Sequence, residues 1–533
     1  MKRFVLFGLD GATYTVLDDL IREGVMPYLG RFLQESAKGV LESVTPPLTP
    51  PAWTTLVTGR TPGRHGITGF VQFRSADSDQ LQIASSRDVH CETIWSLVNR
   101  YGLRAGCLNF VLHAPPPRFD GFVVPGWTPW RWLGRFTRPR GLMEELAADI
   151  DDFSVQQLAM DYEIERKAVA GAPLDDYESW INLHIQRDRQ WFQVLRRQMQ
   201  KDPTELLGIV FDGVDKLQHL LWPYVDPACA DQASDERWRR VREVCLEYYR
   251  QIDRFLEETV ELAGPEAHVM IASDHGFTGG EDILYINRWL EQQGYLTWKE
   301  SVQSVGESAE LEPDFYQLAA FDMTKTKAFA LTASSNGIHI AVRGRRSADG
   351  IPPEEYESFR RELTEALLTR CLHPQTGQPL VTRVWRREEI FAGPYEGLAP
   401  DLTLTLRDHI FFSVRRGESI LVKRPALTGT HHPDGVFALR GPGVRRGEDI
   451  GRLGLVDVAP TIFRCLGLEP VEEFEGVAAE AAFSAPSTAR VAAEVNGSHA
   501  PASLVDAEPA APGEEEGDDE ELIQRLKALG YIE

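Results

Sequence analysis

Short apolar runs along the chain end in charged or glycine-rich turns. Four such runs are FVLFGLDG at 4–11, LLGIVFDGVD at 206–215, HVMIASDHGF at 268–277 and DLTLTL at 401–406. Continuous apolar runs of this length are typical of strands buried on both faces of a largely parallel sheet. Segments with helical spacing lie between them, for example at 236–264 and 356–372. This alternation predicts an α/β sandwich with a largely parallel central sheet and helices on both faces.

Two stretches between these segments differ from them in composition. Residues 114–205 open with a Trp-, Pro- and Arg-rich run, and residues 291–400 contain long polar turns. Since long connections usually carry function, we interpret both as inserted cap regions of one catalytic domain that spans 1–470. After about residue 480 the composition turns to Ala, Ser, Pro and Glu. We expect a disordered acidic linker over 480–521 and a C-terminal helix over 522–533, which docks on the body or binds a protein partner.

The charge balance narrows the classes of partner. The formal net charge is −24, a field that repels both nucleic acid backbones and anionic lipid surfaces. We therefore expect neither a nucleic acid polymer nor a membrane as partner, and an anionic substrate would need bound metal ions to offset this field.

The six cysteines contain no CxxC pair, and the N-terminal apolar run is shorter than the roughly 7 to 15 residues of a signal peptide. Both features predict a cytoplasmic protein.

Acidic and histidine residues gather where the predicted strands end. Asp10 follows the first apolar run, and Asp274 and His275 follow the run at 268–273. In open α/β sheets, ligands bind beyond the carboxyl ends of the strands. These residues are therefore candidate metal ligands, although Asp10 also fits a cap of the following helix and an Asp-His dipeptide alone is a weak signal.

Two further motifs supply ligand types of the same kind. Asp215 and His219 are four residues apart, which places both side chains on one helical face, where they could hold a metal ion or form a surface pair. His431 and His432 lie in GTHHPDG, which is also compatible with a plain surface turn. Zinc favours mixed His and Asp ligands, and this number of groups exceeds one tetrahedral shell. We expect two divalent metal ions, zinc foremost and manganese as the second candidate.

Thr49 stands in an unusually constrained stretch, LTPPAWTTLVTG. The two prolines that follow it fix the local φ angles, pre-proline sterics favour an extended Thr49, and AWTTLVTG predicts a helix. A helix N-terminus favours a bound anion, and a hydroxyl held beside metal ions can act as a nucleophile. Thr49 is equally compatible with an N-cap ahead of a proline at the first helical position.

In chain order, these motifs resemble the alkaline phosphatase superfamily, and most closely its type I phosphodiesterase and nucleotide pyrophosphatase branch. The resemblance covers most of residues 1–470 and rests on FGLDG, LTPPAWTTLVTGRTPGRHGI, DGVDKLQH, ASDHGF, GTHHPDG and VDVAPTIFRCLGL. It implies that Thr49 is the nucleophile and also contacts a zinc ion. The implied ligands of that zinc are Asp10, Asp274 and His275, and those of a second zinc are Asp215, His219 and one loop histidine, for which His431 fits the motif better than His432.

The chain also departs from its relatives. The run from Thr49 to Trp53 lacks the oxidisable cysteine or serine and the arginine of sulfatases, which removes the central support for that activity. They read Pro-Pro-Ala where nucleotide pyrophosphatases have Phe-Pro-Asn, so the base-binding habits of those enzymes do not transfer. Asn109 matches a family asparagine that steadies a phosphate oxygen, or else it binds a loop.

The resulting hypothesis is a hydrolase of small-molecule phosphoesters, diesters or pyrophosphates, that acts through a phosphothreonine at Thr49. One alternative is a phosphomonoesterase, phosphonate hydrolase or phosphotransferase on the same site, and another is a non-catalytic binding protein on a retained fold. Trp127, Trp130 and Arg131 are positioned in the sequence to grip the substrate or, as the more common outcome for tryptophans, to pack in the core.

Overall fold

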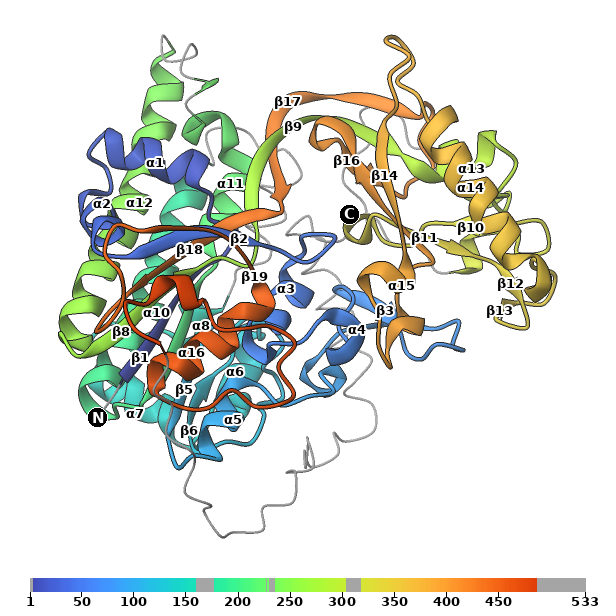
Figure 1. Ribbon diagram of the computed structural model, residues 1–533. Helices are drawn as coiled ribbons and strands as arrows, with labels where there is room; N and C mark the ends of the chain where they lie inside the picture. The colour runs from blue at the N-terminus through green and yellow to red at the C-terminus, as the bar shows by residue number, and fades with distance from the viewer. Residues whose placement is uncertain (1–2, 160–176, 227, 230–234, 303–317, 487–533) are drawn as a thin grey trace.

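An eight-stranded sheet forms the centre of the larger of two lobes (Figure 1). The computed structural model describes residues 3–159, 177–226, 228–229, 235–302 and 318–486. The strand order is β19 (Asp449–Gly454), β2 (Ala37–Glu42), β18 (Asp434–Arg440), β8 (Ala267–Ala272), β1 (Arg3–Leu9), β7 (Leu206–Phe211), β5 (Ala105–Leu108) and β6 (Gly121–Val124). Neighbouring strands from β8 to β6 are parallel, whereas β18 runs antiparallel to β8 and β2. The predicted α/β fold with a largely parallel sheet is confirmed.

Both faces of this sheet are covered, which explains the continuous apolar runs. Along β1, Val5, Phe7 and Leu9 pack in one core cluster, while Phe4 and Leu6 pack in the other. Successive side chains of a strand point to opposite faces, so a strand between two helical layers must be apolar throughout. The first layer contains α1 (Tyr14–Arg22), α2 (Pro27–Gln34), α6 (Trp130–Phe136), α7 (Leu142–Asp149), α8 (Val155–Leu158), α10 (Tyr177–Lys201), α11 (Gly213–Val225) and α12 (Glu236–Ala263). The second contains α3 (Thr49–Thr58), α5 (Ile94–Asn99) and α16 (Val458–Leu466).

The 114–205 stretch lies within the larger lobe. It contributes β6, which pairs with β5 at the edge of the central sheet, and α10, which packs against α12. The stacked rings of Phe192 and Phe255, whose centroids are 4.1 Å apart, join these two long helices. The expected helix over 236–264 is α12.

The smaller lobe is built largely from the 291–400 stretch. Its four-stranded sheet has the order β10 (Ala328–Phe329), β11 (Gly337–Ile340), β15 (Leu402–Leu406) and β14 (Val381–Arg386), and it packs with α13 (Ile286–Gln292) and α14 (Tyr356–Arg370). The interpretation of DLTLTL as part of the parallel sheet is wrong, because β15 pairs antiparallel with β11 and β14. Its alternating Leu and Thr residues are the pattern of an antiparallel strand with one less buried face.

Two long strands connect the lobes. β9 (Gly276–Tyr285) and β17 (Leu421–His432) pair antiparallel and run from the central sheet across to the smaller lobe, with β16 (Phe411–Ser413) beside β9 (Figure 1). The remaining short elements are β3 (Val71–Phe73), β4 (Leu81–Ile83), β12 (Val342–Arg343), β13 (Arg346–Ser347), α4 (Pro62–His65) and α15 (Arg387–Ile390).

Two expectations concern other parts of the chain. Most of the predicted acidic linker over 480–521 and the whole predicted helix over 522–533 lie outside the described residues. Within the described ranges, no helix has both the length and the apolar character that a membrane span requires.

The six cysteines are free thiols, and five of them are buried.

Candidate active site

The carboxyl ends of three adjacent strands bring the predicted site residues together. Asp10 directly follows β1, and Asp274 and His275 follow its neighbour β8, while Asp215 lies in the first turn of α11 after β7. Because these strands are parallel, their carboxyl ends share one edge of the sheet. The side chains of all four residues are buried, with at most 1% of any residue exposed.

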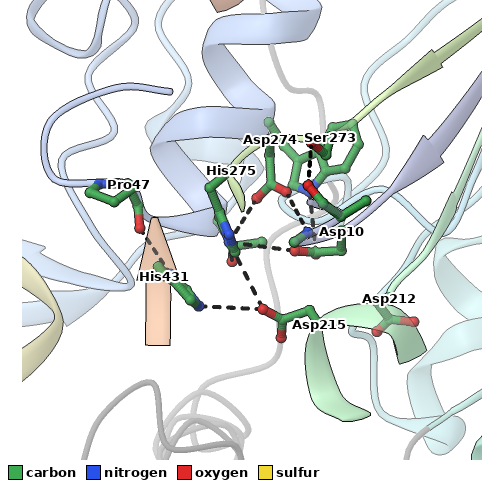
Figure 2. A network of polar contacts seen from close by, with 12 residues as sticks. Asp10, Pro47, Asp212, Asp215, Ser273, Asp274, His275 and His431 are labelled. Atoms are coloured by element: carbon green, nitrogen blue, oxygen red, sulfur yellow. Dashed lines mark hydrogen bonds and ion pairs between the residues drawn. The ribbon is translucent and has the colours of Figure 1, made fainter. Parts of the chain in front are cut away.

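Asp10, Asp274 and His275 form the first ligand group (Figure 2). His275 Nε2 lies 3.6 Å from Asp10 Oδ1 and 3.3 Å from Asp274 Oδ2. The backbone N–H of Gly11 donates to the other Asp274 oxygen at 3.2 Å. Asp10 Oδ1 and Asp274 Oδ2 are buried, and neither accepts a hydrogen bond from any described residue. Buried carboxylate oxygens normally have a partner, so this pair of oxygens fits a bound cation.

Asp215, His219 and His431 form the second group. Asp215 Oδ1 lies 3.3 Å from His431 Nε2 and 3.5 Å from His219 Nε2, and the two histidine nitrogens are 3.0 Å apart. His275 Nε2 is 3.9 Å from the same Asp215 oxygen, so it links the two groups. The helical Asp215–His219 pair is therefore not a surface pair, because Asp215 is completely buried.

Backbone carbonyls fix the tautomers of two of these histidines. His431 Nδ1 lies 2.8 Å from the Pro47 carbonyl oxygen, and His275 Nδ1 lies 3.1 Å from that of Gly276. A carbonyl only accepts, so each Nδ1 carries the proton and each neutral ring turns the lone pair of its Nε2 toward the carboxylates. A lone pair that faces carboxylate oxygens is unfavourable without a cation between them. This arrangement is the one in which histidines bind metal ions.

The pKa values of the acidic groups express the same crowding of charge. Burial, together with the charges of Asp274 and Asp215, raises the pKa of Asp10 well above its usual value, and burial and Asp215 raise the pKa of Asp274 to about 7. Burial also raises the pKa of Asp215, but His219 and His431 outweigh it and leave that pKa below its usual value.

The pKa values of the neighbouring histidines are lowered. Burial lowers the pKa of His219 to about 4 and that of His275 well below its usual value. Neutral imidazoles beside carboxylates, all withdrawn from water, form the mixed nitrogen and oxygen donor set that suits zinc. The residues present thus fit two divalent cations.

Thr49 lies beside both groups. Its Oγ1 is 3.2 Å from His275 Nε2, and Thr49 is completely buried. The expectation that Thr49 is an extended N-cap is wrong, because α3 begins at Thr49 and Leu48 is the extended cap residue, with φ −136° and ψ 129°. Pro50 thus occupies the second helical position, where a missing N–H costs no hydrogen bond. The predicted helix itself is confirmed, and it ends at Gly59 in the left-handed region with φ 64°.

The structure excludes two roles that the sequence allowed: Asp10 as a helix cap and His432 as a metal ligand. Asp10 does not cap the next helix, since Thr13 is the residue before α1. His432 turns away from the ligands: its ring is 5.1 Å from that of His409, and its Nδ1 accepts from the backbone of Asp434. The loop histidine brought to Asp215 is His431.

Trp53 is a site residue that the sequence reasoning missed. Its indole Nε1–H donates to Asp10 Oδ2 at 3.3 Å, from one turn after Thr49 on α3. The spacing of four residues is a signal that could have found it, because it places both side chains on the same face of the helix.

Asp212 also follows a strand of the central sheet, β7, but turns away from the ligands (Figure 2). It contacts the buried cations Arg187 and Lys216. The Asn109 side-chain amide donates to the Val210 carbonyl at 2.7 Å and to Asp212 Oδ1 at 3.2 Å. These contacts favour the interpretation of Asn109 as a residue that holds a loop.

The Trp-rich segment makes mixed contacts. The Trp127 ring stacks on Phe70 with centroids 5.8 Å apart, and Lys216 Nζ lies 5.5 Å from its centroid. Trp130 is 49% exposed and Arg131 is also exposed, so neither packs in the core.

A cavity of about 300 Å³ adjoins the second ligand group. Its walls include His219 and His431, the segment 45–48, and parts of the smaller lobe at 333–336 and 404–412. Ligand pockets commonly start at about this volume. The cavity can therefore hold a molecule substantially larger than a single phosphate group.

Solved structures share this fold at low sequence identity. Human ectonucleotide pyrophosphatase / phosphodiesterase 5 matches with a TM-score of 0.52 and 13% identity, covering 91% of this chain and 100% of that one. Phosphonoacetate hydrolase from Sinorhizobium meliloti 1021, in complex with phosphonoformate, matches with a TM-score of 0.50 and 16% identity, covering 87% of this chain and 95% of that one. Comparison with curated proteins finds no match.

The family comparison covers the whole candidate site. The profile described as type I phosphodiesterase / nucleotide pyrophosphatase matches residues 4–434. This range contains every predicted ligand from Asp10 to His431, as well as Thr49. The chain belongs to the type I phosphodiesterase / nucleotide pyrophosphatase family and is an enzyme of the phosphoester hydrolase class.

Proposed function

We propose that this protein hydrolyses small-molecule phosphodiesters or pyrophosphates at a two-metal site, through a phosphothreonine formed on Thr49. The observation that carries the proposal is the position of Thr49 Oγ1, 3.2 Å from His275 Nε2, where the two ligand groups meet. Among the candidate ligands, Thr49 is the one residue whose side chain offers a hydroxyl.

The donor atoms suggest how the metal ions would be held. Asp10, Asp274 and His275, with Thr49 beside them, would hold one ion, and Asp215, His219 and His431 would hold the other. Zinc suits this mixture of imidazole and carboxylate ligands, and manganese is the second candidate. When bound, two divalent cations would supply positive charge that lowers the pKa of a hydroxyl or a water and offsets the charge on phosphate oxygens.

The proposed reaction has two substitution steps at phosphorus. In the first, the Thr49 hydroxyl oxygen forms a bond to phosphorus, the bond from phosphorus to the leaving oxygen breaks, and the hydroxyl proton passes by way of water to that leaving oxygen. In the second, water attacks the phosphothreonine, the bond to Thr49 breaks, and the hydroxyl is restored. Because Thr49 is the first residue of α3, the N–H groups of that first turn also favour a negatively charged group beside it.

The adjoining cavity supports a substrate with an organic group on phosphorus. At about 300 Å³ it offers room for an organic group next to His219 and His431. A monoester or a phosphonate would use the same residues, so turnover of a matched panel distinguishes these substrate classes.

The direct test measures hydrolysis of a chromogenic diester, a pyrophosphate ester, a monoester and phosphonoacetate by full-length protein supplied with zinc or manganese. We expect the diester or the pyrophosphate ester to be hydrolysed fastest, and Thr49→Ala to lose on the order of a thousandfold or more of that rate. Acid quenching followed by mass spectrometry should find phosphate on Thr49. Thr54→Ala, a buried threonine whose hydroxyl donates to the Pro50 carbonyl of its own helix, serves as the control and should retain activity. Equal rates for wild type and Thr49→Ala would contradict the nucleophile assignment.

A further inference from the structure

A positively charged side chain, Arg424, lines the cavity beside the ligand groups. Arg424 and His431 both line it, and both belong to β17, the strand that joins the two lobes. Arg424 is partly buried, and its guanidinium carbon lies 4.3 Å from the centroid of the Phe411 ring. The rest of the lining is mixed, with Leu404, Leu406 and Ile410 among its apolar residues and Asn336, Thr405 and His409 among its polar ones.

Among the described residues, Arg424 has no acidic partner, unlike two other cations of this region. Lys423, its neighbour in sequence, is exposed and pairs with Glu281 at 2.8 Å, and Arg416 pairs with Glu291 at 3.0 Å. Within the described part of the chain, no carboxylate forms an ion pair with Arg424. Burial lowers the pKa of Arg424 to about 10, so the group still carries its charge at neutral pH. A protonated guanidinium withdrawn from water is costly unless an anion accompanies it.

The register of β17 against β9 gives the backbone separation between the Arg424 segment and the ligand His431. Lys423 pairs with Asp282 of β9, and His431 pairs with Phe277, while the residues of β17 between Lys423 and Thr428 form a bulge. Five steps of β9 separate these two backbone positions, about 17 Å along the strand, whereas the side chains of Arg424, His219 and His431 all line the same cavity. A molecule bound in this cavity can therefore contact Arg424 and the second ligand group at once.

We propose that Arg424 binds a second anionic group, a carboxylate or a phosphate, at the far end of the substrate whose phosphoester is cleaved at Thr49. The inference rests on the proposed function for the reaction, and it adds the substrate class: a phosphoester that carries a second oxyanion. A guanidinium suits this role because its planar N–H groups bind two oxygens of a carboxylate or phosphate at once. The stacking on Phe411 would hold that plane in place.

The test uses ligands that are not hydrolysed. Alkylphosphonates of increasing chain length, each ending in a carboxylate, a second phosphonate or a neutral carboxamide, are titrated into zinc-supplied full-length protein by calorimetry. At one range of lengths we expect a charged tail to bind about tenfold tighter than the matched carboxamide, the value of one charge-assisted interaction. The carboxylate and phosphonate arms identify which oxyanion is preferred.

Variants at two neighbouring positions assign the preference to one side chain. Arg424→Gln should abolish the preference for a charged tail, and Arg424→Lys should keep part of it, since a lysine retains the charge without the planar pair of donors. Lys423→Gln removes an adjacent exposed charge and should leave the preference intact. A wild type that shows no preference at any length overturns the proposal, as does a preference that survives in Arg424→Gln or disappears equally in Lys423→Gln.

Hydrolysis of a chromogenic diester by the same preparations separates this inference from the proposed function. Turnover without a tail preference would overturn the Arg424 site and leave the hydrolase assignment standing. A tail preference without any turnover would contradict the proposed reaction and support the site as a binding site.

Discussion

His219 Nε2 and His431 Nε2 lie 3.0 Å apart, and both face the same oxygen of Asp215. The Pro47 carbonyl occupies the Nδ1–H of His431, so the Nε2 of that ring has a lone pair to offer. Two imidazole nitrogens this close beside a buried carboxylate share either a proton or a cation. Because burial lowers the pKa of His219 to about 4, a shared proton is disfavoured at neutral pH, and a metal ion is the better partner.

His431→Ala should therefore lower the metal content of the protein. We expect wild type to bind close to two equivalents of zinc and His431→Ala to bind about one tightly, because one ligand group loses a donor. Hydrolysis should fall by a factor of about a hundred or more, the scale for losing charge stabilisation at a reacting phosphate. His432→Ala is the matched control, since its ring faces His409 instead of Asp215. Equal metal content in the two variants, measured by atomic emission after dialysis, would contradict this assignment.

The stabilising effect of zinc should depend on pH. The raised pKa of Asp274, about 7, means that the metal-free folded protein holds a proton that the unfolded chain releases near its ordinary carboxyl pKa of about 4. The free energy of unfolding of the metal-free protein therefore decreases as pH rises from about 4 to about 7, since the folded state binds more protons in that window. A bound cation removes this penalty by pairing with the ionised carboxylates.

The gain in melting temperature on adding zinc should thus be larger at about pH 8 than at about pH 5.5, where a proton competes for Asp274. Asp274→Asn should show a smaller gain with a flatter pH dependence. Differential scanning calorimetry with and without zinc measures both. Equal gains for wild type at the two pH values would show that the buried carboxylates do not control metal binding.

The sequence was sufficient to predict the α/β sandwich and the meeting of Asp10, Asp274 and His275. Asp10 directly follows one apolar strand, Asp274 and His275 lie just after the end of its neighbour, and parallel strands place their carboxyl ends at one edge. The partner sheet of DLTLTL could not be predicted, because a short apolar run does not specify which strands it pairs with. The interpretation of Thr49 as an extended N-cap was wrong for a related reason: whether the residue before a proline is extended or helical depends on the tertiary contacts of the first turn.

Arg424 lay beyond sequence reasoning for a different reason. What distinguishes it from Lys423 is the lack of a carboxylate partner within the described chain, which is a property of the folded cavity. The contact of Trp53 with Asp10 likewise joins residues from two separate elements, although the spacing from Thr49 gave a hint of it.

Trp53→Phe should weaken metal binding without unfolding the protein. The phenyl ring keeps most of the packing of Trp53, but it removes the N–H that orients Asp10 at 3.3 Å. Groups that orient metal ligands typically contribute about 10- to 100-fold in metal affinity, and we expect a value near the lower end because this hydrogen bond is long. Competition with a fluorescent zinc chelator measures the affinity. An unchanged affinity together with a normal melting temperature would show that Asp10 needs no such support.

Substitutions at Asn109 and Arg187 should mainly lower the free energy of unfolding. Asp212 is completely buried, and the charges of Arg187 and Lys216 hold its pKa below the usual value against the effect of burial. Arg187→Met would leave Lys216 as the remaining cation beside Asp212, and we expect a loss of about 3–5 kcal/mol in the free energy of unfolding. Asn109→Ala should lose about 1–3 kcal/mol, because the buried Val210 carbonyl would lose its side-chain donor.

The two interpretations of Asn109 make different predictions for catalysis. If Asn109 holds the loop, Asn109→Ala protein that remains folded should keep a kcat within a few-fold of wild type. Asn99→Ala is the control: its amide likewise has two acceptors, the backbone carbonyls of Leu103 at 2.7 Å and Asp120 at 3.2 Å, at the end of α5. Urea unfolding gives the stability of each variant, and steady-state hydrolysis gives kcat. A kcat that falls about a hundredfold in Asn109→Ala, but not in Asn99→Ala, would instead assign Asn109 to the phosphate oxygen.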